Sequence, residues 1–403
     1  MNPKVIYRIA SFNIRQFSNN SVMHNEDKDS KKSLEAISNI VRDNNIDIIA
    51  IQEIAGVVAF KELLAAIAFH YVQDITAEMR EREGDIISEN GAGDYVACVA
   101  GKWQGRWASP NSKWGTAISE EGYAFIWNSE RLDLPENDRG RVQPVIKHKS
   151  EIYYVRPPFY GRFITKDIMV KFEICLLNTH VLYTKNASLK KVRDSGIDVE
   201  LLNSDDKMER IRVKKELMEF GLTPMEIDVL EQFVNKSDIQ RRQMEVNNLI
   251  KEIMVREEDS RGWGSYVIML GDYNLNLNSS NGGYKNRKAT IPDTITYAAG
   301  KKGEQKSYSI VQKELTTLKA PPNKEKDTNN EYDGLNGNER YANNYDHFTY
   351  NSNFTMEGQA GGRGVYISNP PVRINAIEQM GLSNREYFER VSDHLPILIE
   401  IGF

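Results

Sequence analysis

The chain has 403 residues, of which 40% are apolar, and a formal net charge of -5. This length suits one large α/β domain or two smaller ones, and no run of 18 apolar residues is present, which excludes a membrane-spanning helix and argues against a membrane partner. The acidic balance excludes a protein coated in basic surface, but a local basic patch would still serve a nucleic-acid enzyme.

The amino terminus begins with a predicted strand. Residues 4–14, KVIYRIASFNI, are β-prone, and they lack the apolar run and small-residue cleavage site of a signal peptide. Two cysteines, Cys98 and Cys175, lie in apolar strand-like runs, which fits two buried thiols and excludes a disulfide framework. We therefore expect a cytoplasmic protein, with the mature form of a secreted protein as the alternative.

Strands and helices alternate further along the chain. Residues 30–45 repeat apolar side chains with the period of an amphipathic helix, and the short apolar strand IDIIAIQEI follows. The later strand candidates are YAFIWN, FITKDIMVKFEICLLNTH, SYVIMLGDYN, NYDHFTYN and SDHLPILIEI. Every strand except YAFIWN has polar residues at one end, which is typical of α/β enzymes with their chemistry at strand ends.

Two long segments separate the later strands. Residues 185–258 are highly charged and predict capped helices, so we expect a helical insertion that is either a solvated lobe or a surface for a protein partner. Residues 277–344 are rich in Asn, Gly, Lys and Ser and predict a flexible loop. Both belong to one predicted catalytic domain, 1–403, and a linker in place of 196–256 is expected to leave the protein folded.

Six groups of polar residues mark the strand ends. They are Asn13; Gln52 and Glu53; Asn178, Thr179 and His180; Asp272 and Asn274; Asp346; and Ser392, Asp393 and His394. Their hard oxygen donors suit Mg²⁺, Mn²⁺ or Ca²⁺ rather than Zn²⁺. A divalent ion, an acid that orients water and a histidine held by a carboxylate are the groups that phosphodiester hydrolysis requires.

Asp272 and Asn274 directly follow the apolar run YVIMLG. Two residues apart on an extended chain, their side chains would leave the same face of the strand. An acceptor-only carboxylate and a donor-acceptor amide would then hold one water or one metal ion together.

These motifs together resemble the endonuclease/exonuclease/phosphatase superfamily. The resemblance is carried by RIASFNIRQF, IIAIQE, EEGYAFIWN, NTH, VIMLGDYN, YDHF and VSDHLPI, which span nearly the whole chain. Within the superfamily, YVRPPF and GLSN make the chain most similar to deoxyribonuclease I. The resemblance implies a four-layer α/β/β/α sandwich of two packed, mostly antiparallel mixed sheets. It also implies a Mg²⁺-dependent endonuclease that hydrolyses DNA, with Mn²⁺ or Ca²⁺ as alternative ions.

The resemblance assigns a role to each polar residue. The implied metal ligands are Glu53, Asp393 and Asn13. The implied catalytic residues are His180, His394, Asp272, Asn274, Asp346 and Glu121, with His394 paired to Asp346 and His180 paired to Glu121. The implied substrate contacts are Arg15, Arg156 and Asn178. Which histidine is the acid and which the base stays open.

Two positions depart from the family pattern. Asn276 stands where the family nuclease has an acid, and His347 stands where an arginine commonly follows the Asp of the YD motif. These departures leave the implied catalytic residues in place. The alternatives, which would share the same fold, are an inositol-phosphate phosphatase or sphingomyelinase-type phosphoesterase, an abasic-site repair nuclease and a catalytically silent binding module.

The stretch GKWQGRWASPNSKWG combines Trp103, Trp107 and Trp114 with three cations and no acid. Nucleic-acid bases stack on aromatic rings, and Lys and Arg pair with phosphates, so the stretch suits a contact to DNA. The alternative is that the tryptophans close one end of the sandwich and the cations are solvated.

Overall fold

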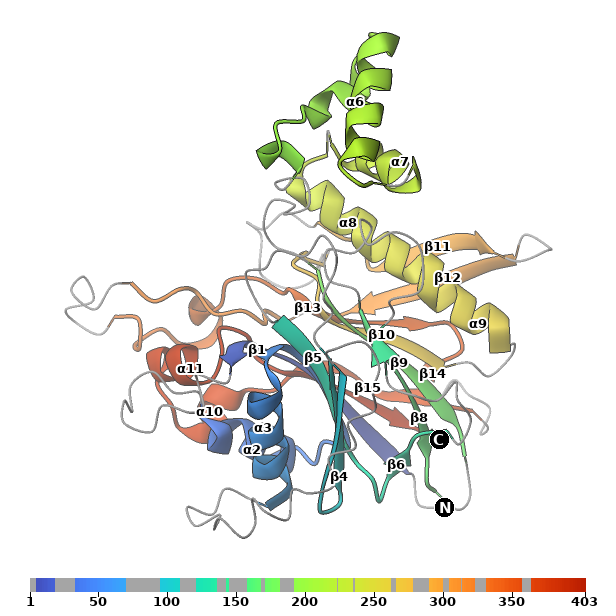
Figure 1. The fold of residues 1–403 in the computed structure, drawn as a ribbon. Helices are drawn as coiled ribbons and strands as arrows, with labels where there is room; N and C mark the ends of the chain where they lie inside the picture. Colours follow the sequence, from blue (N-terminus) through green and yellow to red (C-terminus); the bar gives the residue numbers. More distant parts are fainter. Residues whose placement is uncertain are drawn as a thin grey trace.

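The computed structural model describes residues 5–18, 33–69, 95–108, 121–135, 143–144, 158–167, 171–181, 192–222, 224–234, 236–261, 266–277, 290–299, 304–312, 314–322, 331–356 and 364–403. Their strands form two sheets that pack face to face (Figure 1).

Sheet A is a mixed sheet in which β1 and β2 run parallel at its centre. Its strand order is β14 (Thr355–Met356), β15 (Tyr366–Arg373), β16 (Ile397–Gly402), β1 (Ile6–Ser18), β2 (Ile48–Ala55), β5 (Glu121–Asn128), β4 (Trp103–Ala108) and β3 (Tyr95–Ala100). The other neighbours of β1 and β2 are antiparallel to them, so the amino-terminal motifs lie in the middle of the sheet.

Sheet B is also mixed, with β9 and β10 parallel at its centre. Its strand order is β11 (Thr294–Ala299), β12 (Glu304–Val311), β13 (Asp346–Asn351), β10 (Tyr266–Asp272), β9 (Glu173–His180), β8 (Phe159–Thr165) and β6 (Leu132–Asp133), and β7 (Gln143–Pro144) also pairs with β8.

Three apolar layers hold four structural layers together. Ile9, Phe125 and Ile268 belong to the core between the two sheets. Helices α2 (Leu34–Asp43), α3 (Val57–Phe69), α10 (Ala376–Met380) and α11 (Asn384–Arg390) cover the outer face of sheet A. Helices α8 (Asp238–Leu249) and α9 (Val255–Arg261), joined by a π-helical turn at Ile250–Met254, cover sheet B. The predicted α/β/β/α sandwich is confirmed.

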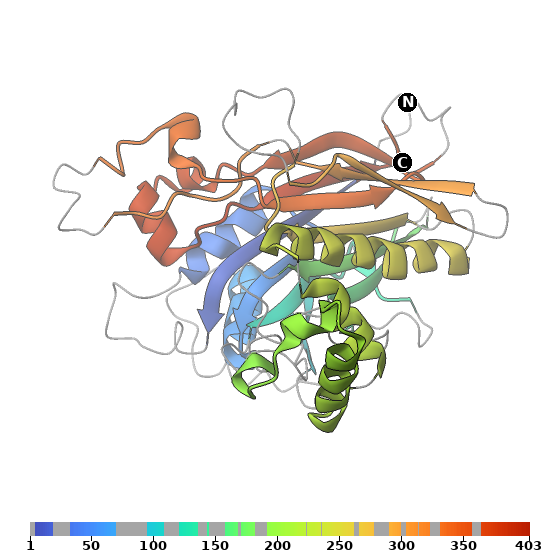
Figure 2. The same cartoon turned by 90° about the horizontal axis from the view of Figure 1, so that it is seen from above.

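The remaining helices of the insertion form a separate cluster. A 3-10 helix (Val199–Asn203), α6 (Lys207–Glu219) and α7 (Pro224–Phe233) bury their apolar side chains against one another, among them Val213, Leu217 and Ile227. Figures 1 and 2 show these elements standing away from the sheets beyond the start of α8. Val246, Leu249 and Ile253 instead pack on sheet B. The expected lobe of residues 196–256 is therefore wrong in its second half, because α8 is part of the main core.

Residues 192–236 should be removable without unfolding the protein. Replacing them by a short flexible linker leaves every side chain that packs on sheet B in place. Replacing 196–256 also removes six buried apolar side chains from that sheet, all of them between Val246 and Val255. Each contributes about 2 kcal/mol, so their sum is comparable to the whole stability of a domain. Thermal unfolding measures both variants. Loss of cooperative unfolding in the 192–236 variant would contradict the separation of the two clusters.

The segment 277–344 contains strands that the sequence analysis missed. Strands β11 and β12 form a hairpin that joins sheet B through β13, and a 3-10 helix occupies Gly337–Arg340. The signal was present as alternation in β12, where Tyr308 and Ile310 are buried and Ser307 and Ser309 are half-buried. Residues 278–289 and 323–330 of the predicted flexible loop lie outside the described residues.

Within the described segments, no helix is long and apolar enough to cross a membrane. Cys98 and Cys175 are buried in different sheets.

Candidate active site

The ladder of sheet B places three polar residues side by side. In the parallel pair of β9 and β10, Asp272 lies opposite His180, and in the antiparallel pair of β10 and β13 it lies opposite Asp346. Gly271 permits this approach, because its φ is +137° and a Cβ there would lie 1.9 Å from the carbonyl oxygen of Thr179. The motif LGD thus sets an acid between a histidine and a second acid.

Sheet A brings Asn13 and Glu53 to the same place from the opposite side. The Nδ2 of Asn13 donates to Glu53 Oε1 at 2.9 Å and to Asp272 Oδ2 at 3.2 Å. The backbone N–H of Gln16 donates to Glu53 Oε2 at 3.0 Å. Asn13 therefore bridges an acid of each sheet and closes the site across the sandwich.

Two histidines converge on one oxygen of Asp272. The Nε2 of His180 lies 3.5 Å from Asp272 Oδ2 and 3.7 Å from Glu53 Oε1, and the Nε2 of His394 lies 3.6 Å from Asp272 Oδ2. The other ring nitrogen of His394, Nδ1, lies 2.8 Å from Asp346 Oδ2. The structure thus brings together the predicted pair His394 and Asp346 with Asp272, Glu53 and His180.

Burial and charge set the protonation of this cluster. Burial raises the pKa of Asp272 to about 7, against the attraction of His394. Burial by itself would lower the pKa of His394, but Asp346 and Asp272 outweigh it and hold that pKa well above its usual value. At neutral pH His394 is therefore an imidazolium, and Asp272 is poised to take or release a proton.

Strained backbone gathers around the same residues. Among the described residues, the non-glycine positions with positive φ are Arg15 (45°), Gln16 (50°), Asn45 (49°), Glu53 (61°) and Asn274 (50°). All except Asn45 are at or next to the predicted site. Such conformations are uncommon for side chains with a Cβ and concentrate at functional sites, which supports this end of the sandwich as the active one.

No protein-family model matches the chain, and no curated protein sequence matches it either. Several solved structures are similar to it. The endonuclease/exonuclease/phosphatase from Bacteroides vulgatus is 11% identical over 99% of both chains, with a TM-score of 0.43. ANGEL2, a 2′,3′-cyclic phosphatase, is 12% identical over 99% of this chain and 95% of its own, with a TM-score of 0.42. D. rerio TDP2 complexed with single-strand DNA product is 9% identical over 99% of both chains, with a TM-score of 0.39.

The first of these structures bears the name of the superfamily that the motifs resemble. At identities and TM-scores this low, the comparison does not transfer residue roles. The roles proposed below are therefore inferred from this chain's own side chains. The finer similarity to deoxyribonuclease I stays a prediction.

The predicted metal ligands Glu53, Asp393 and Asn13 do not all point toward one another in this structure, and a metal site built from these three residues stays a prediction. Asp393 Oδ2 lies 3.6 Å from Arg15 Nε, and Asn13 turns a donor rather than an oxygen toward Glu53, because its Oδ1 already accepts the N–H of Arg15. Among the described residues, no three acidic, His or Cys side chains are arranged to hold a metal ion. Glu53 by itself still fits a hard cation, because each carboxylate oxygen accepts one N–H and keeps a lone pair. Mg²⁺ is commonly held by one or two carboxylates, with water and substrate oxygens as its other ligands.

Asn178 and Asn274 lie differently from the prediction. The Nδ2 of Asn178 donates inside the sandwich to the carbonyls of Ile51 and Ala124, and its Oδ1 accepts from Gln52, so the amide is occupied away from any substrate. The Nδ2 of Asn274 donates to the carbonyl of Val181. The extended-chain argument for Asn274 is wrong because the chain turns after Asp272.

Two predicted residues are not tested here. Arg156 lies outside the described residues, and so does the side chain of Glu121, whose backbone begins β5. The pairing of Glu121 with His180 therefore stays a prediction.

The tryptophan stretch is not a stacking platform where the structure describes it. Trp103 and Trp107 are buried in β4 and pack in the core under α3, so they neither stack on a ligand nor close one end of the sandwich. Trp114 lies outside the described residues. The two rings fall four residues apart and so share one face of the strand.

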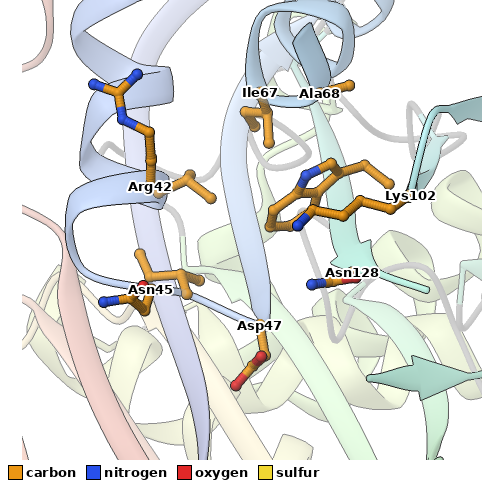
Figure 3. A pocket seen from close by; sticks show the side chains of 10 residues that line it. Arg42, Asn45, Asp47, Ile67, Ala68, Lys102 and Asn128 are labelled. Atoms are coloured by element: carbon orange, nitrogen blue, oxygen red, sulfur yellow. The ribbon is translucent and has the colours of Figure 1, made fainter. Parts of the chain in front are cut away.

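A cavity of about 300 Å³ lies at the other end of the strands, where β2 begins and β5 ends. Figure 3 shows Arg42, Lys102 and Asn128 around it, with Asp47 at one side. The Asp47 carboxylate accepts from the Arg8 backbone at 2.9 Å and from Arg131 Nε at 2.9 Å. Asp47 thus links β1 to Arg131, and the cavity is remote from the cluster around Asp272.

His347 supports the loop that follows Asp272, a role that sequence analysis missed. Its ring is fully buried, its Nε2 lies 2.8 Å from the carbonyl oxygen of Leu275, and it packs beside Tyr273 at 5.2 Å between ring centroids. The backbone N–H of Tyr273 donates to Tyr345. The missing arginine after Asp346 is thus replaced by a buried neutral ring.

His347 should make the protein less stable in mild acid. Burial lowers the pKa of His347 to about 4, whereas an unfolded histidine titrates near 6.5. The unfolded chain therefore binds a proton between these values that the folded chain does not, and stability falls as pH drops from about 6.5 to about 4, by up to about 3 kcal/mol.

Urea unfolding at several pH values tests this dependence. The variant His347→Gln keeps a donor for Leu275 but cannot titrate, so its stability should fall less over that window. If stability falls equally with pH in the wild type and in His347→Gln, the acid sensitivity comes from other groups.

Proposed function

We propose that this protein is a metal-dependent phosphodiesterase that acts as an endonuclease on nucleic acid, with DNA as its substrate. The observation that carries the proposal is the convergence of His180 and His394 on Asp272, with Glu53 beside His180. Phosphodiester hydrolysis requires an attacking water, a group to take its proton and positive charge near the phosphoryl oxygens. The cluster offers a proton acceptor and positive charge from this chain, and the attacking water would come from solvent.

Asp272 is the proposed general base. Its pKa of about 7 gives a carboxylate strong enough to accept a proton from water at neutral pH. His394 is the proposed cation that faces the phosphoryl group, because Asp346 keeps its ring charged and fixes its orientation through Nδ1. His180, between Glu53 and Asp272, is placed to bind a phosphoryl oxygen or to protonate the leaving group.

Glu53 is the proposed metal ligand. When bound, a divalent ion would neutralise charge on the phosphoryl oxygens and the departing alkoxide. Asn13 and the backbone N–H of Gln16 each donate a hydrogen bond to the carboxylate and hold it in place.

Plasmid nicking with Mg²⁺ or Mn²⁺ tests the proposal directly. The same preparation is assayed on an inositol phosphate, on sphingomyelin and on a duplex with an abasic site, which represent the alternatives. Nicking that EDTA abolishes is the expected result. Hydrolysis of a small phosphoester without nicking would replace the nuclease by a phosphatase, and no hydrolysis of any substrate would favour a silent binding module.

Arg15 is the proposed contact to the phosphate backbone. Its guanidinium stacks 4.3 Å from the centre of the Phe388 ring and lies beside Asp393, which holds it at the edge of the site with 38% of its side chain exposed. An arginine presented in this way can pair with a phosphate without choosing a base.

Binding to duplex DNA should weaken steeply with salt. Each neutralised phosphate contributes about -0.9 to the slope of log K against log salt, so several contacts give a slope well beyond -1. Arg15→Ala should lower the magnitude of the slope by about 1 on all sequences alike. The matched control is Arg42→Ala, because the Arg42 side chain is 46% exposed on α2 near the remote cavity. A wild-type slope of magnitude near 1 or less would contradict the duplex-nuclease proposal.

A further inference from the structure

Glu53 lies at a β-bulge in β2. The register of β2 against β5 shifts between Gln52 and Ile54, which makes Glu53 the extra residue, and its φ is 61°. A bulge turns one side chain out of the regular alternation of a strand and re-aims it. The direction of the Glu53 carboxylate therefore depends on how the bulge is held.

Asn178 holds the bulge from the facing sheet. Its Nδ2 donates to the carbonyl oxygens of Ile51 at 2.9 Å and Ala124 at 3.2 Å, which lie opposite each other in the β2–β5 ladder. Its Oδ1 accepts from Gln52 Nε2 at 2.6 Å. One fully buried amide of sheet B thus bonds to both strands just before Glu53.

Trp107 holds the bulge on its other side. Its indole Nε1 donates to the carbonyl oxygen of Ile54, the residue after Glu53, at 2.9 Å. Gly122 makes room for the ring, because a Cβ there would lie 2.5 Å from Trp107 Nε1 and 2.7 Å from the Ile54 oxygen. The backbone is thus bonded by side chains immediately before and immediately after Glu53.

We propose that Asn178 and Trp107 are positioning residues that hold this bulge and so keep Glu53 beside His180. Asn178 lies two residues before His180 on β9. The strand that carries His180 therefore also carries the amide that bonds to β2 beside Glu53. The effect of Asn178 and Trp107 on catalysis rests on the proposed function. Their effect on the position of Glu53 does not.

The amide of Gln16 reports the position of Glu53 without any assay of activity. Gln16 is exposed, and its N–H donates to Glu53 Oε2. If the bulge relaxes, that amide loses its acceptor and exchanges with solvent faster, while amides in the core strands keep their protection.

The first test is Asn178→Leu, a substitution of similar size that removes all three hydrogen bonds. We expect Gln16 amide exchange, followed by NMR, to rise roughly 10-fold or more. We expect kcat to fall roughly 10²-fold with KM within a few-fold, because the acid and the histidine are misplaced rather than the substrate. Trp107→Phe keeps an aromatic ring but loses the N–H. It should also raise Gln16 exchange and lower kcat, but by less than Asn178→Leu, because it removes one hydrogen bond rather than three.

Two further variants separate positioning from general stability. Asn178→Leu leaves Gln52 Nε2 without its shortest hydrogen bond, so the double variant Gln52→Met with Asn178→Leu removes both polar side chains and should be more stable than Asn178→Leu. Tyr308→Phe deletes a partly buried hydrogen bond to Glu258 at 2.8 Å on the outer face of sheet B, and should leave Gln16 exchange and kcat unchanged.

Unchanged Gln16 exchange in the folded Asn178→Leu or double variant would overturn the proposal, as would an equal rise in Tyr308→Phe. A rise confined to the Asn178 and Trp107 variants supports it. That result would stand even if the wild-type protein hydrolysed no phosphoester, in which case the proposed function alone would fail.

Discussion

Replacing Glu53 by Gln is expected to lower phosphodiester hydrolysis by roughly 10²-fold or more, because a bound metal ion contributes several kcal/mol to charge stabilisation. The substitution keeps the length and shape of the side chain but removes its charge. It also turns one acceptor into a donor that faces either Asn13 Nδ2 or the N–H of Gln16, both of which donate to the carboxylate. Initial rates measured over a range of Mg²⁺ concentrations separate a weaker metal site from a damaged fold, since weaker binding is partly restored by excess ion.

The matched control is Glu130→Gln. Glu130 has a side chain that is 68% exposed, and it follows the end of β5 that is remote from the site. Its rate should equal that of the wild type. Cleavage by Glu53→Gln as fast as by the wild type at low Mg²⁺ would show that Glu53 does not bind the metal.

His180→Ala and His394→Ala are each expected to lower kcat by roughly 10²-fold or more, as for a group that transfers a proton or binds the phosphoryl oxygen in the transition state. Both rings lie within 3.6 Å of the same Asp272 oxygen, so in the proposed mechanism both serve one reacting group. The double variant should therefore cost less than the product of the two single effects.

Single-turnover rates of the four proteins complete this cycle. Strict additivity in log rate would show that the histidines do not share a transition state, and a small loss in either single variant would leave that histidine a structural role. Thermal unfolding is measured beside the rates, because His394→Ala leaves the Asp346 carboxylate buried without its imidazole.

The strand ends were predictable because their patterns are local. A run of apolar residues, a glycine and then an acid, as in IMLGD, indicates a buried strand that stops at a polar edge. The same holds for His180 and Glu53. The hairpin of β11 and β12 was missed because it is an edge element with one mostly exposed face, so its alternation is weak beside its Asn-, Lys- and Gly-rich surroundings.

Roles that depend on the direction of one side chain were less predictable. Trp107 belongs to a stretch whose composition suits nucleic-acid contact, yet its ring is buried and its N–H bonds to Ile54. Asn178 sits beside His180 in sequence, yet its amide is used between the sheets. Composition reports what a side chain can do, whereas the partner it meets depends on the strand across the sandwich.

The sequence by itself determined which residues stand at the ends of buried strands, and therefore the chemistry available there: acids and amides with hard oxygen donors, and imidazoles. Only the tertiary structure decided which of them meet. His394 reaches Asp346 across 48 residues and Asn13 reaches Asp272 across 259, while Asp393 turns to Arg15 instead of Glu53. The physical reason is range. Periodicity sets the face from which a side chain leaves its own strand, but a hydrogen bond requires about 3 Å between two atoms, and only the packing of the two sheets sets that distance.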